Sequence, residues 1–245
     1  GVLTITGTST FTTTEAAGDI TLDQISSFTG AVSLNTAAGA GNDASLINAA
    51  IALDLGASTV GGTYTIETNA GSIIDSGVLT ITGASSFTTT TANDDITLDQ
   101  VNLFTGAVSL ATNGATGNIS VTNVGAALNL GTITTTLTGT LAIETNTGSI
   151  TDSGVTTASG TSSYAITVAG DDITLDQIST YTGAITITAA GAGSDVSITN
   201  ANLDVDLGTT TVGGNLVIET DNNSITDSGV LTITGTSTFT TTEAA

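Results

Sequence analysis

The chain has 245 residues, 22 of them Asp or Glu, and contains no Lys, Arg, His, Cys, Pro, Met or Trp. Its formal net charge of −22 argues against binding to nucleic acid or anionic lipid, because both rely on basic side chains to neutralise phosphate. Without Cys there is no disulfide or thiolate metal site, and no apolar run approaches the ~18 residues of a membrane span. The apolar share of 39% is ordinary, so a packed core is expected rather than a disordered chain.

One segment recurs along the whole chain. GVLTITGTSTFTTTEAA occupies residues 1–17 and returns identically at 229–245, while related segments open at Gly77 and Gly154. The units are therefore 1–76, 77–153 and 154–228, and residues 229–245 begin a fourth unit. Such periodicity predicts one continuous repeat structure and a fragment of a longer array.

Short strands are expected in the same order within each unit. At the start of unit 1, Leu3 and Ile5 alternate with Thr4 and Thr6, which places the aliphatic side chains on one face of a strand. No window has helical periodicity, and Gly, Asn and Asp separate the alternating runs. Within unit 1 the same alternation recurs at 20–22, 32–34 and 64–66.

Each unit divides into three turns of roughly 23, 30 and 23 residues, the size of one coil of a β-solenoid. We therefore predict an all-β, right-handed parallel β-helix with about three coils in each repeat unit. One coil cannot bury its apolar face alone, whereas stacked coils share a core. We expect Gly30, Gly106 and Gly183 to occupy corners that need unusual backbone angles.

Unit 3 departs from unit 2 at two neighbouring strands. Leu79 and Ile81 of unit 2 align with Thr156 and Ala158, which weakens that strand of unit 3. A few residues later, Thr89 and Thr91 align with Ile166 and Val168. We expect the apolar volume of the core to be preserved while its location shifts, so Ile166 should point inward.

The acidic residues are the first candidates for chemistry. Asp94 with Asp95, and Asp171 with Asp172, form adjacent pairs. Neighbouring strand residues point to opposite faces, so these pairs are better read as turn residues than as catalytic carboxylates. Calcium is the one plausible cofactor, because it prefers oxygen ligands. Its weak candidate ligands recur in every unit: Asp19, Asp23, Asp95, Asp99, Asp172 and Asp176.

Recurring aromatic and threonine residues allow two further interpretations. An exposed aromatic row would favour carbohydrate stacking, whereas an interior ladder is the expected arrangement because aromatic side chains dominate core burial. Thr-x-Thr pairs such as Thr63 and Thr65 are compatible with ice binding, although Ser33 and Asn35 interrupt a continuous array. The aromatic positions are Phe11, Phe87, Tyr164 and Phe239, and Phe28, Phe104 and Tyr181.

The repeat resembles a known family. The strings SITDSGVLTITGTSTFT, DITLDQISSFTGAVSL and LDLGASTVGG are similar to the repeat region of filamentous-haemagglutinin-like bacterial exoproteins. That resemblance covers essentially the whole chain. It implies a right-handed parallel β-helix exported to the bacterial cell surface, often by two-partner secretion, as an adhesin, shaft or matrix fibre.

These observations lead to one functional expectation and one alternative. We expect a non-catalytic structural shaft of an extracellular filament or giant adhesin, because the common nucleophile and base arrangements need His, Cys or Lys. The alternative is an adhesin module that binds carbohydrate or a host surface. The expected partner is the chain itself, by coil stacking or lateral association, with no nucleic acid and no membrane insertion.

Overall fold

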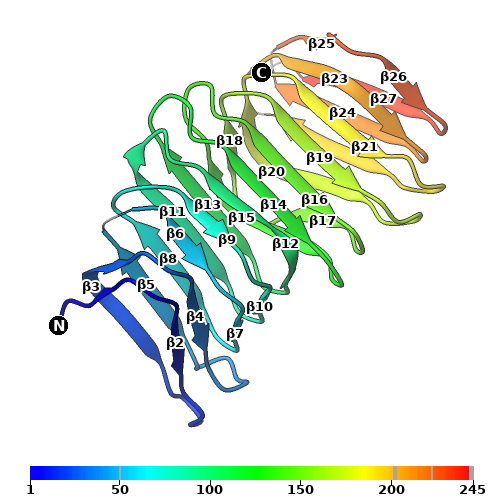
Figure 1. Ribbon diagram of the computed structural model, residues 1–245. Coiled ribbons are helices and arrows are strands. Elements are labelled where there is room, and N and C mark those ends of the chain that lie inside the picture. Colours follow the sequence, from blue (N-terminus) through cyan, green and yellow to red (C-terminus); the bar gives the residue numbers. More distant parts are fainter. Residues whose placement is uncertain (50, 201–202, 222, 243–245) are drawn as a thin grey trace.

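The computed structural model describes residues 1–49, 51–200, 203–221 and 223–242, and every regular element in these ranges is a β-strand. The strands form two parallel sheets that run along one elongated stack (Figure 1). After each strand of the first sheet the chain crosses to the second sheet and then returns one level higher. The described residues thus form a parallel β-solenoid of about 11 coils, which confirms the predicted fold.

The two sheets have similar numbers of strands. The first contains β1 (Thr4–Ile5), β3 (Ile20–Phe28), β5 (Ala44–Asn48), β8 (Tyr64–Thr68), β11 (Ser85–Ala92), β13 (Val108–Asn113), β15 (Leu128–Thr134), β17 (Ile150–Asp152), β18 (Thr156–Ala158), β20 (Ile173–Tyr181), β22 (Val196–Asn200), β24 (Leu216–Asp221) and β27 (Ser237–Thr242). The second contains β2 (Ser9–Thr12), β4 (Val32–Asn35), β6 (Leu53–Leu55), β7 (Ser58–Val60), β9 (Ile73–Asp75), β10 (Leu79–Ile81), β12 (Ile96–Phe104), β14 (Ile119–Asn123), β16 (Leu141–Thr145), β19 (Ser162–Ile166), β21 (Ile185–Ala189), β23 (Val205–Val212), β25 (Ile225–Asp227) and β26 (Leu231–Ile233).

The repeat unit and the coil are out of step by half a turn. Strand pairing joins Ile20 to Ala44 in the next coil, and Ala44 to Tyr64 in the coil after that. At this spacing one repeat unit takes about three and a half coils, where the sequence predicted about three. Equivalent segments consequently alternate between the sheets: β2 and β19 lie in the second sheet, and β11 and β27 in the first.

Aliphatic side chains fill the space between the sheets, and polar side chains complete the core at one bend of the coil. Ser26, Asn48 and Thr68 stack on successive coils and are 0–2% exposed. The Asn48 Oδ1 accepts the N–H of Phe28 at 2.9 Å, and its Nδ2 donates to the carbonyl of Ile51 at 3.1 Å. These bonds satisfy backbone groups that the bend leaves without a strand partner.

The corner glycines are required for a different reason from the one predicted. Gly30, Gly106 and Gly183 are not among the residues with positive φ. Each instead lies directly over a glycine of the preceding coil, and a Cβ on Gly106 would come within 2.2 Å of the carbonyl oxygen of Gly83. The expectation of unusual backbone angles was therefore wrong, and close stacking of corners excludes a side chain here.

The loss of apolar side chains from one strand of unit 3 is compensated in part by the neighbouring strand. Thr156 is fully buried and Ile166 is 2% exposed, so the prediction that Ile166 points inward is confirmed. Val168, in contrast, is 38% exposed and adds nothing to the core. The expected shift of apolar volume therefore holds for one of the two residues.

Candidate functional sites

Adjacent carboxylates at the corners connect three coils. The Asp94 Oδ2 accepts the N–H of Gly71 at 2.8 Å, and the Asp95 Oδ1 accepts the N–H of Asn118 at 2.7 Å. In the next unit, Asp171 accepts from Gly148 at 2.7 Å and Asp172 from Asp195 at 2.8 Å. One carboxylate of each pair thus holds the coil before it and the other holds the coil after it. The prediction that these pairs structure turns is confirmed.

Three of the calcium candidates belong to ladders of corner hydrogen bonds. Asp19 accepts the N–H of Asp43 at 3.0 Å, and Asp43 accepts the N–H of Thr63 at 2.7 Å. Asp95 and Asp172 cap the next coil in the same way, as described above. In these positions a carboxylate oxygen is already engaged by a backbone donor, which gives each residue a structural role without a metal.

The other three candidates lie at an exposed bulge of the longest strands. Asp23, Asp99 and Asp176 each accept a hydrogen bond from the side chain of the following Gln, at 3.0–3.2 Å. Within the described ranges, no group of three or more Asp and Glu side chains is placed to hold a metal ion. The six candidates are therefore not brought together, and calcium binding stays a prediction.

One buried and one half-buried carboxylate were not singled out from the sequence. Asp75 is 6% exposed and accepts the N–H of Asp99 at 3.0 Å, the N–H of Gln100 at 3.4 Å and the Nδ2 of Asn102 at 2.6 Å. Burial raises its pKa, and the hydrogen bonds offset part of that effect. The equivalent Asp152 also accepts from the next coil, and burial raises its pKa to about 6.

Strand alternation contained the signal for these residues. In β9, Ile73 and Asp75 are two positions apart, so they share the inward face. Unlike the Asp residues of the turns, Asp75 therefore had to be buried with Ile73. Because burial raises the pKa of Asp75 and of Asp152, both carboxyl groups gain a proton more readily in mild acid than a free aspartate does.

The aromatic residues form interior pairs. Phe87 and Phe104 meet edge to face across the two sheets with ring centroids 6.0 Å apart, and both are fully buried. The predicted interior arrangement is confirmed for Phe28, Phe87, Phe104, Tyr164 and Tyr181, whereas Phe11 is only partly buried and Phe239 is exposed. Tyr64 of the neighbouring coil also meets Phe87 edge to face at 5.8 Å, but a continuous ladder does not form, because the recurring cross-sheet pairs are about three and a half coils apart. The other cross-sheet pairs are Phe11 with Phe28 and Tyr164 with Tyr181.

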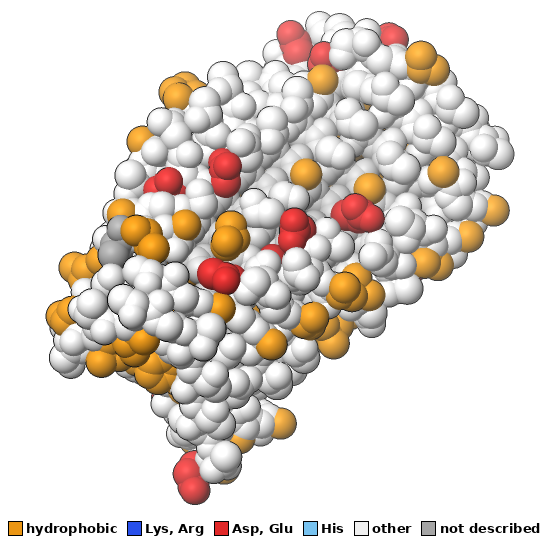
Figure 2. All heavy atoms as spheres, in the orientation of Figure 1, with side chains coloured by type: hydrophobic (Ala, Val, Ile, Leu, Met, Phe, Trp, Pro, Cys, Tyr) orange, Lys and Arg blue, Asp and Glu red, His pale blue; other side chains and the backbone are white. Residues whose placement is uncertain are grey.

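Along the stack, each outward-facing Thr lies next to residues of different types on the neighbouring coils. Thr65 pairs with Ser45 on one side and Ser86 on the other, and Thr80 pairs with Thr59 and Leu103. Figure 2 shows acidic side chains scattered over one face, and apolar side chains that are scattered along it and gather at the N-terminal end of the stack. A regular Thr array of the kind expected for ice binding is not present in these rows.

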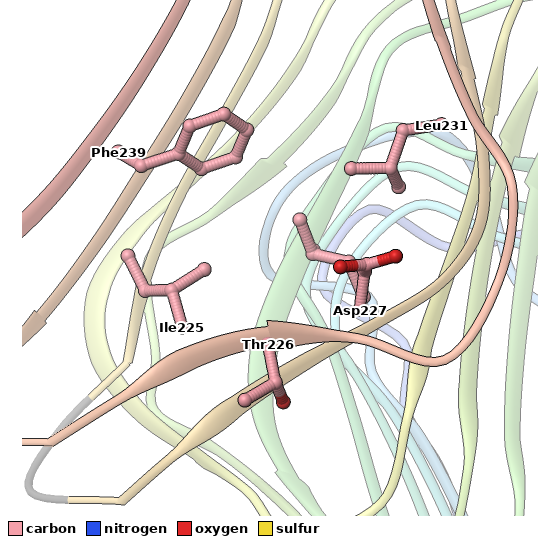
Figure 3. Close-up of a pocket in the computed structure, with 6 residues that line it drawn as sticks. Ile225, Thr226, Asp227, Leu231 and Phe239 are labelled. Atoms are coloured by element: carbon pink, nitrogen blue, oxygen red, sulfur yellow. The ribbon is translucent and has the colours of Figure 1, made fainter.

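A hollow opens where the described stack ends. It is lined by Leu207, Ile225, Thr226, Asp227, Leu231 and Phe239. Figure 3 shows Phe239, Leu231, Ile225 and Asp227 directed toward a common space, while Thr226 points away from it. Leu231 is partly buried, and Phe239 is 44% exposed. The hollow is therefore the uncovered cross-section of the core, with one carboxylate at its edge.

Comparison with known proteins identifies a repeat family. A family model described as repeats of unknown function (DUF5649) matches residues 1–35, 41–111, 116–188 and 193–245. No curated protein and no solved structure matches the chain. In the described residues, no helix is long and apolar enough to cross a membrane.

Proposed function

The chain belongs to the family of repeats of unknown function (DUF5649), and we propose that it is a non-catalytic structural shaft of an extracellular bacterial filament or giant adhesin. The observation that carries the proposal is the continuous two-sheet stack in which each repeat takes about three and a half coils. Its resemblance to filamentous-haemagglutinin-like exoproteins supplies the proposed location at the cell surface.

The stacking of coils supports a mechanical role, because the length of the stack is proportional to the number of repeats. Each coil pairs only with the coils next to it, and parallel strands lie about 4.8 Å apart. One repeat therefore adds on the order of 17 Å to the stack. The half-turn between repeats brings each sequence segment to both sides of the rod, so neither side differs systematically from the other.

Composition supports a role without catalysis and outside the cell. The chain has no His, Cys, Lys or Arg, so its Ser and Thr hydroxyls have no such base to activate them. Several recurring carboxylates are engaged by backbone N–H groups of neighbouring coils. The lack of Lys and Arg also leaves no cleavage site for trypsin-like proteases, which suits a protein exposed to them.

Immunogold electron microscopy of the cells that make the protein tests the proposed location. Antibody raised against this chain should label intact cells along filaments or surface projections. Labelling that appears only after the envelope is permeabilised would overturn the extracellular assignment.

Particle length tests the mechanical role independently. Residues 1–228 joined in tandem to a second copy should give particles about twice as long and equally wide by negative-stain microscopy. Compact particles would contradict the shaft. A glycan array probed with the purified chain addresses the alternative adhesin role, and saturable binding there would favour that role.

A further inference from the structure

Unit 2 carries the only Asn-Gly sequence of the chain, Asn113–Gly114. Units 1 and 3 have Ala37–Ala38 and Ala190–Gly191 at the equivalent positions. Asn113 is exposed and ends β13, and Gly114 begins the corner that follows, with a φ of 89°. This corner therefore places a side-chain amide in solvent, directly before a residue that has no side chain to shield its backbone nitrogen.

The side chain of Asn113 is folded back onto the backbone nitrogen of the next residue. The Gly114 N–H donates to the Asn113 Oδ1 at 2.8 Å, and the Asn113 Nδ2 donates to the carbonyl of Thr90 in the preceding coil at 2.7 Å. These two hydrogen bonds fix the orientation of the side-chain amide. Since Oδ1 is bonded to Cγ, they also hold the Gly114 nitrogen beside the Cγ carbon, a proximity that favours formation of a bond between these two atoms.

Other asparagines precede a backbone nitrogen that is engaged by a neighbouring coil. The N–H of Ile119, which follows Asn118, donates to the carbonyl of Thr140 at 2.8 Å. Such a nitrogen cannot turn toward the preceding side chain without breaking a backbone bond between coils, whereas the Gly114 nitrogen already faces that side chain. Backbone bonds to a neighbouring coil also engage the nitrogens that follow Asn35, Asn48, Asn123 and Asn215.

We propose that Asn113–Gly114 is a self-modification site, at which Asn113 loses its side-chain amide without an enzyme. The Gly114 nitrogen gives its proton to a base in solvent and forms a bond to the Asn113 Cγ. The bond between Cγ and Nδ2 breaks, and Nδ2 takes a proton from solvent and leaves as ammonia. Water then opens the resulting succinimide ring at one of its carbonyl carbons. The reaction thus consumes one water molecule and releases one ammonia molecule, with no oxidant or reductant.

The two products differ in how they change the backbone. Opening at Cγ gives aspartate. Opening at the backbone carbonyl carbon of Asn113 gives isoaspartate, in which the chain continues through Cβ and Cγ and is one carbon longer. Either product adds a negative charge to a chain whose net charge is already −22. Either also removes the Nδ2 donor, so the hydrogen bond to the Thr90 carbonyl is lost.

The site lies where isoaspartate would disturb the contact between two coils. The backbone carbonyl of Asn113 accepts the N–H of Asn93 at 2.8 Å, and in isoaspartate this carbonyl no longer belongs to the main chain. Space for an extra carbon is short here, because a Cβ added to Gly114 would lie 2.6 Å from the Asn93 nitrogen. We therefore expect isoaspartate to loosen the corner between β11 and β13. The inference goes beyond the proposed function and does not depend on it.

Incubation of the folded chain in mildly alkaline buffer tests the proposal. Chymotryptic peptide mapping by mass spectrometry, with fragmentation that distinguishes aspartate from isoaspartate, should find both products at position 113. Loss of the amide should be at least about tenfold faster at Asn113 than at Asn118. It should also be faster at higher pH, because the attacking nitrogen must lose its proton. Equal rates at the two residues would overturn the proposal.

The chain unfolded in urea shows whether the fold permits the reaction. An Asn-Gly sequence can react in any flexible chain, so the decisive comparison is between folded and unfolded protein at the same pH. The folded chain should lose the Asn113 amide at a rate within about tenfold of the unfolded rate. A folded chain in which Asn113 stays intact, while the unfolded chain is modified, would refute the proposal, since the corner would then protect this residue.

Asn113→Gln is the matched variant, because it keeps an amide at the same exposed position. Its carbonyl carbon is one methylene farther along the side chain, and the larger ring that would have to form does so much more slowly. We expect no product at position 113 in this variant over the same incubation, and a rate equal to that of the unsubstituted chain would contradict the proposed step.

The modified fraction of the unsubstituted chain tests the structural consequence. Anion exchange separates this fraction by its added charge, and its isoaspartate form should melt at a lower temperature than the unmodified fraction. Equal melting temperatures would contradict the expected loosening of the corner. These measurements use purified protein, so their failure is distinct from a failure of the surface labelling that tests the proposed function.

Discussion

The hydroxyl groups of Tyr164 and Tyr181 lie 2.9 Å apart and hydrogen-bond to each other inside the core. Their rings meet edge to face at 6.2 Å, the arrangement that Phe87 and Phe104 adopt in unit 2. Thr156 lies beside both hydroxyls, at the position where unit 2 has a leucine. Two buried hydroxyls and a shorter neighbour therefore replace an apolar cluster, and one hydroxyl donates a hydrogen bond to the other.

Removal of one member of this hydroxyl pair should destabilise the chain. In Tyr181→Phe, the Tyr164 hydroxyl stays buried without that partner, which costs about 1–3 kcal/mol of unfolding free energy. Urea unfolding followed by circular dichroism measures the difference. The double variant Tyr164→Phe with Tyr181→Phe should recover most of the loss, because neither tyrosine hydroxyl is left buried without its partner. A double variant whose loss equals the sum of the two single losses would contradict this account.

The stacking of glycine corners predicts that a Gly→Ala substitution destabilises the chain at a stacked corner but not at an open position. Gly106→Ala should destabilise by about 1–3 kcal/mol, because its Cβ would overlap the backbone of Gly83 and force the two coils apart. Gly41→Ala is the matched control, since a Cβ there has no atom within 4 Å and should change stability by less than about 0.5 kcal/mol. Thermal unfolding of both variants tests the contrast, and equal melting temperatures would refute close stacking as the reason for glycine.

Alternation and repetition were sufficient to predict the strands, the parallel stacking and the interior aromatics. Alternation and repetition could not, however, predict the number of coils in each repeat. The unit 1–76 divides equally well into three long coils or three and a half short ones. The choice depends on the length of one coil, which is set by pairing between segments far apart in the sequence.

The candidate functional residues could likewise be predicted from the sequence only in part. The Asp94–Asp95 pair was correctly assigned to a turn, but the sequence did not reveal that its two carboxylates bind coils on opposite sides. Asp75 was overlooked because charged residues are rarely buried. Its burial depends on backbone donors of the next coil, which only the three-dimensional register brings within reach.

The buried asparagines predict a strong dependence on side-chain chemistry. Asn123 is fully buried, accepts the N–H of Phe104 at 2.8 Å and donates to the carbonyl of Ala126 at 3.0 Å. Asn123→Leu keeps a similar volume but leaves both backbone groups without these bonds, so we expect a loss of about 2–4 kcal/mol. Asn146→Ala, at an exposed position, should cost less than about 0.5 kcal/mol. Urea midpoints that are similar for the two variants would contradict the structural role of the buried asparagine.

The raised pKa values of Asp75 and Asp152 predict that mild acid stabilises the chain. The pKa of Asp152 is raised from 3.8 to about 6 in the folded chain, so between these pH values the folded state holds a proton that the unfolded state has lost. The unfolding free energy therefore falls as pH rises through this window, and the stabilisation is complete below about pH 4. The melting temperature should accordingly be higher at pH 4.5 than at pH 7, which circular dichroism can measure.

Asp152→Asn isolates the contribution of that one carboxyl group. The variant removes the titrating proton, so its melting temperature should change less between pH 7 and pH 4.5 than that of the unmodified chain. Asp23→Asn makes the same change in net charge at an exposed bulge. It serves as the control, because it lowers the repulsion among the negative charges of the chain as much as Asp152→Asn does. If both variants flatten the pH profile by the same amount, the effect comes from the net charge of −22. If Asp152→Asn flattens the profile more than Asp23→Asn does, the pH effect comes from the half-buried Asp152 carboxyl group.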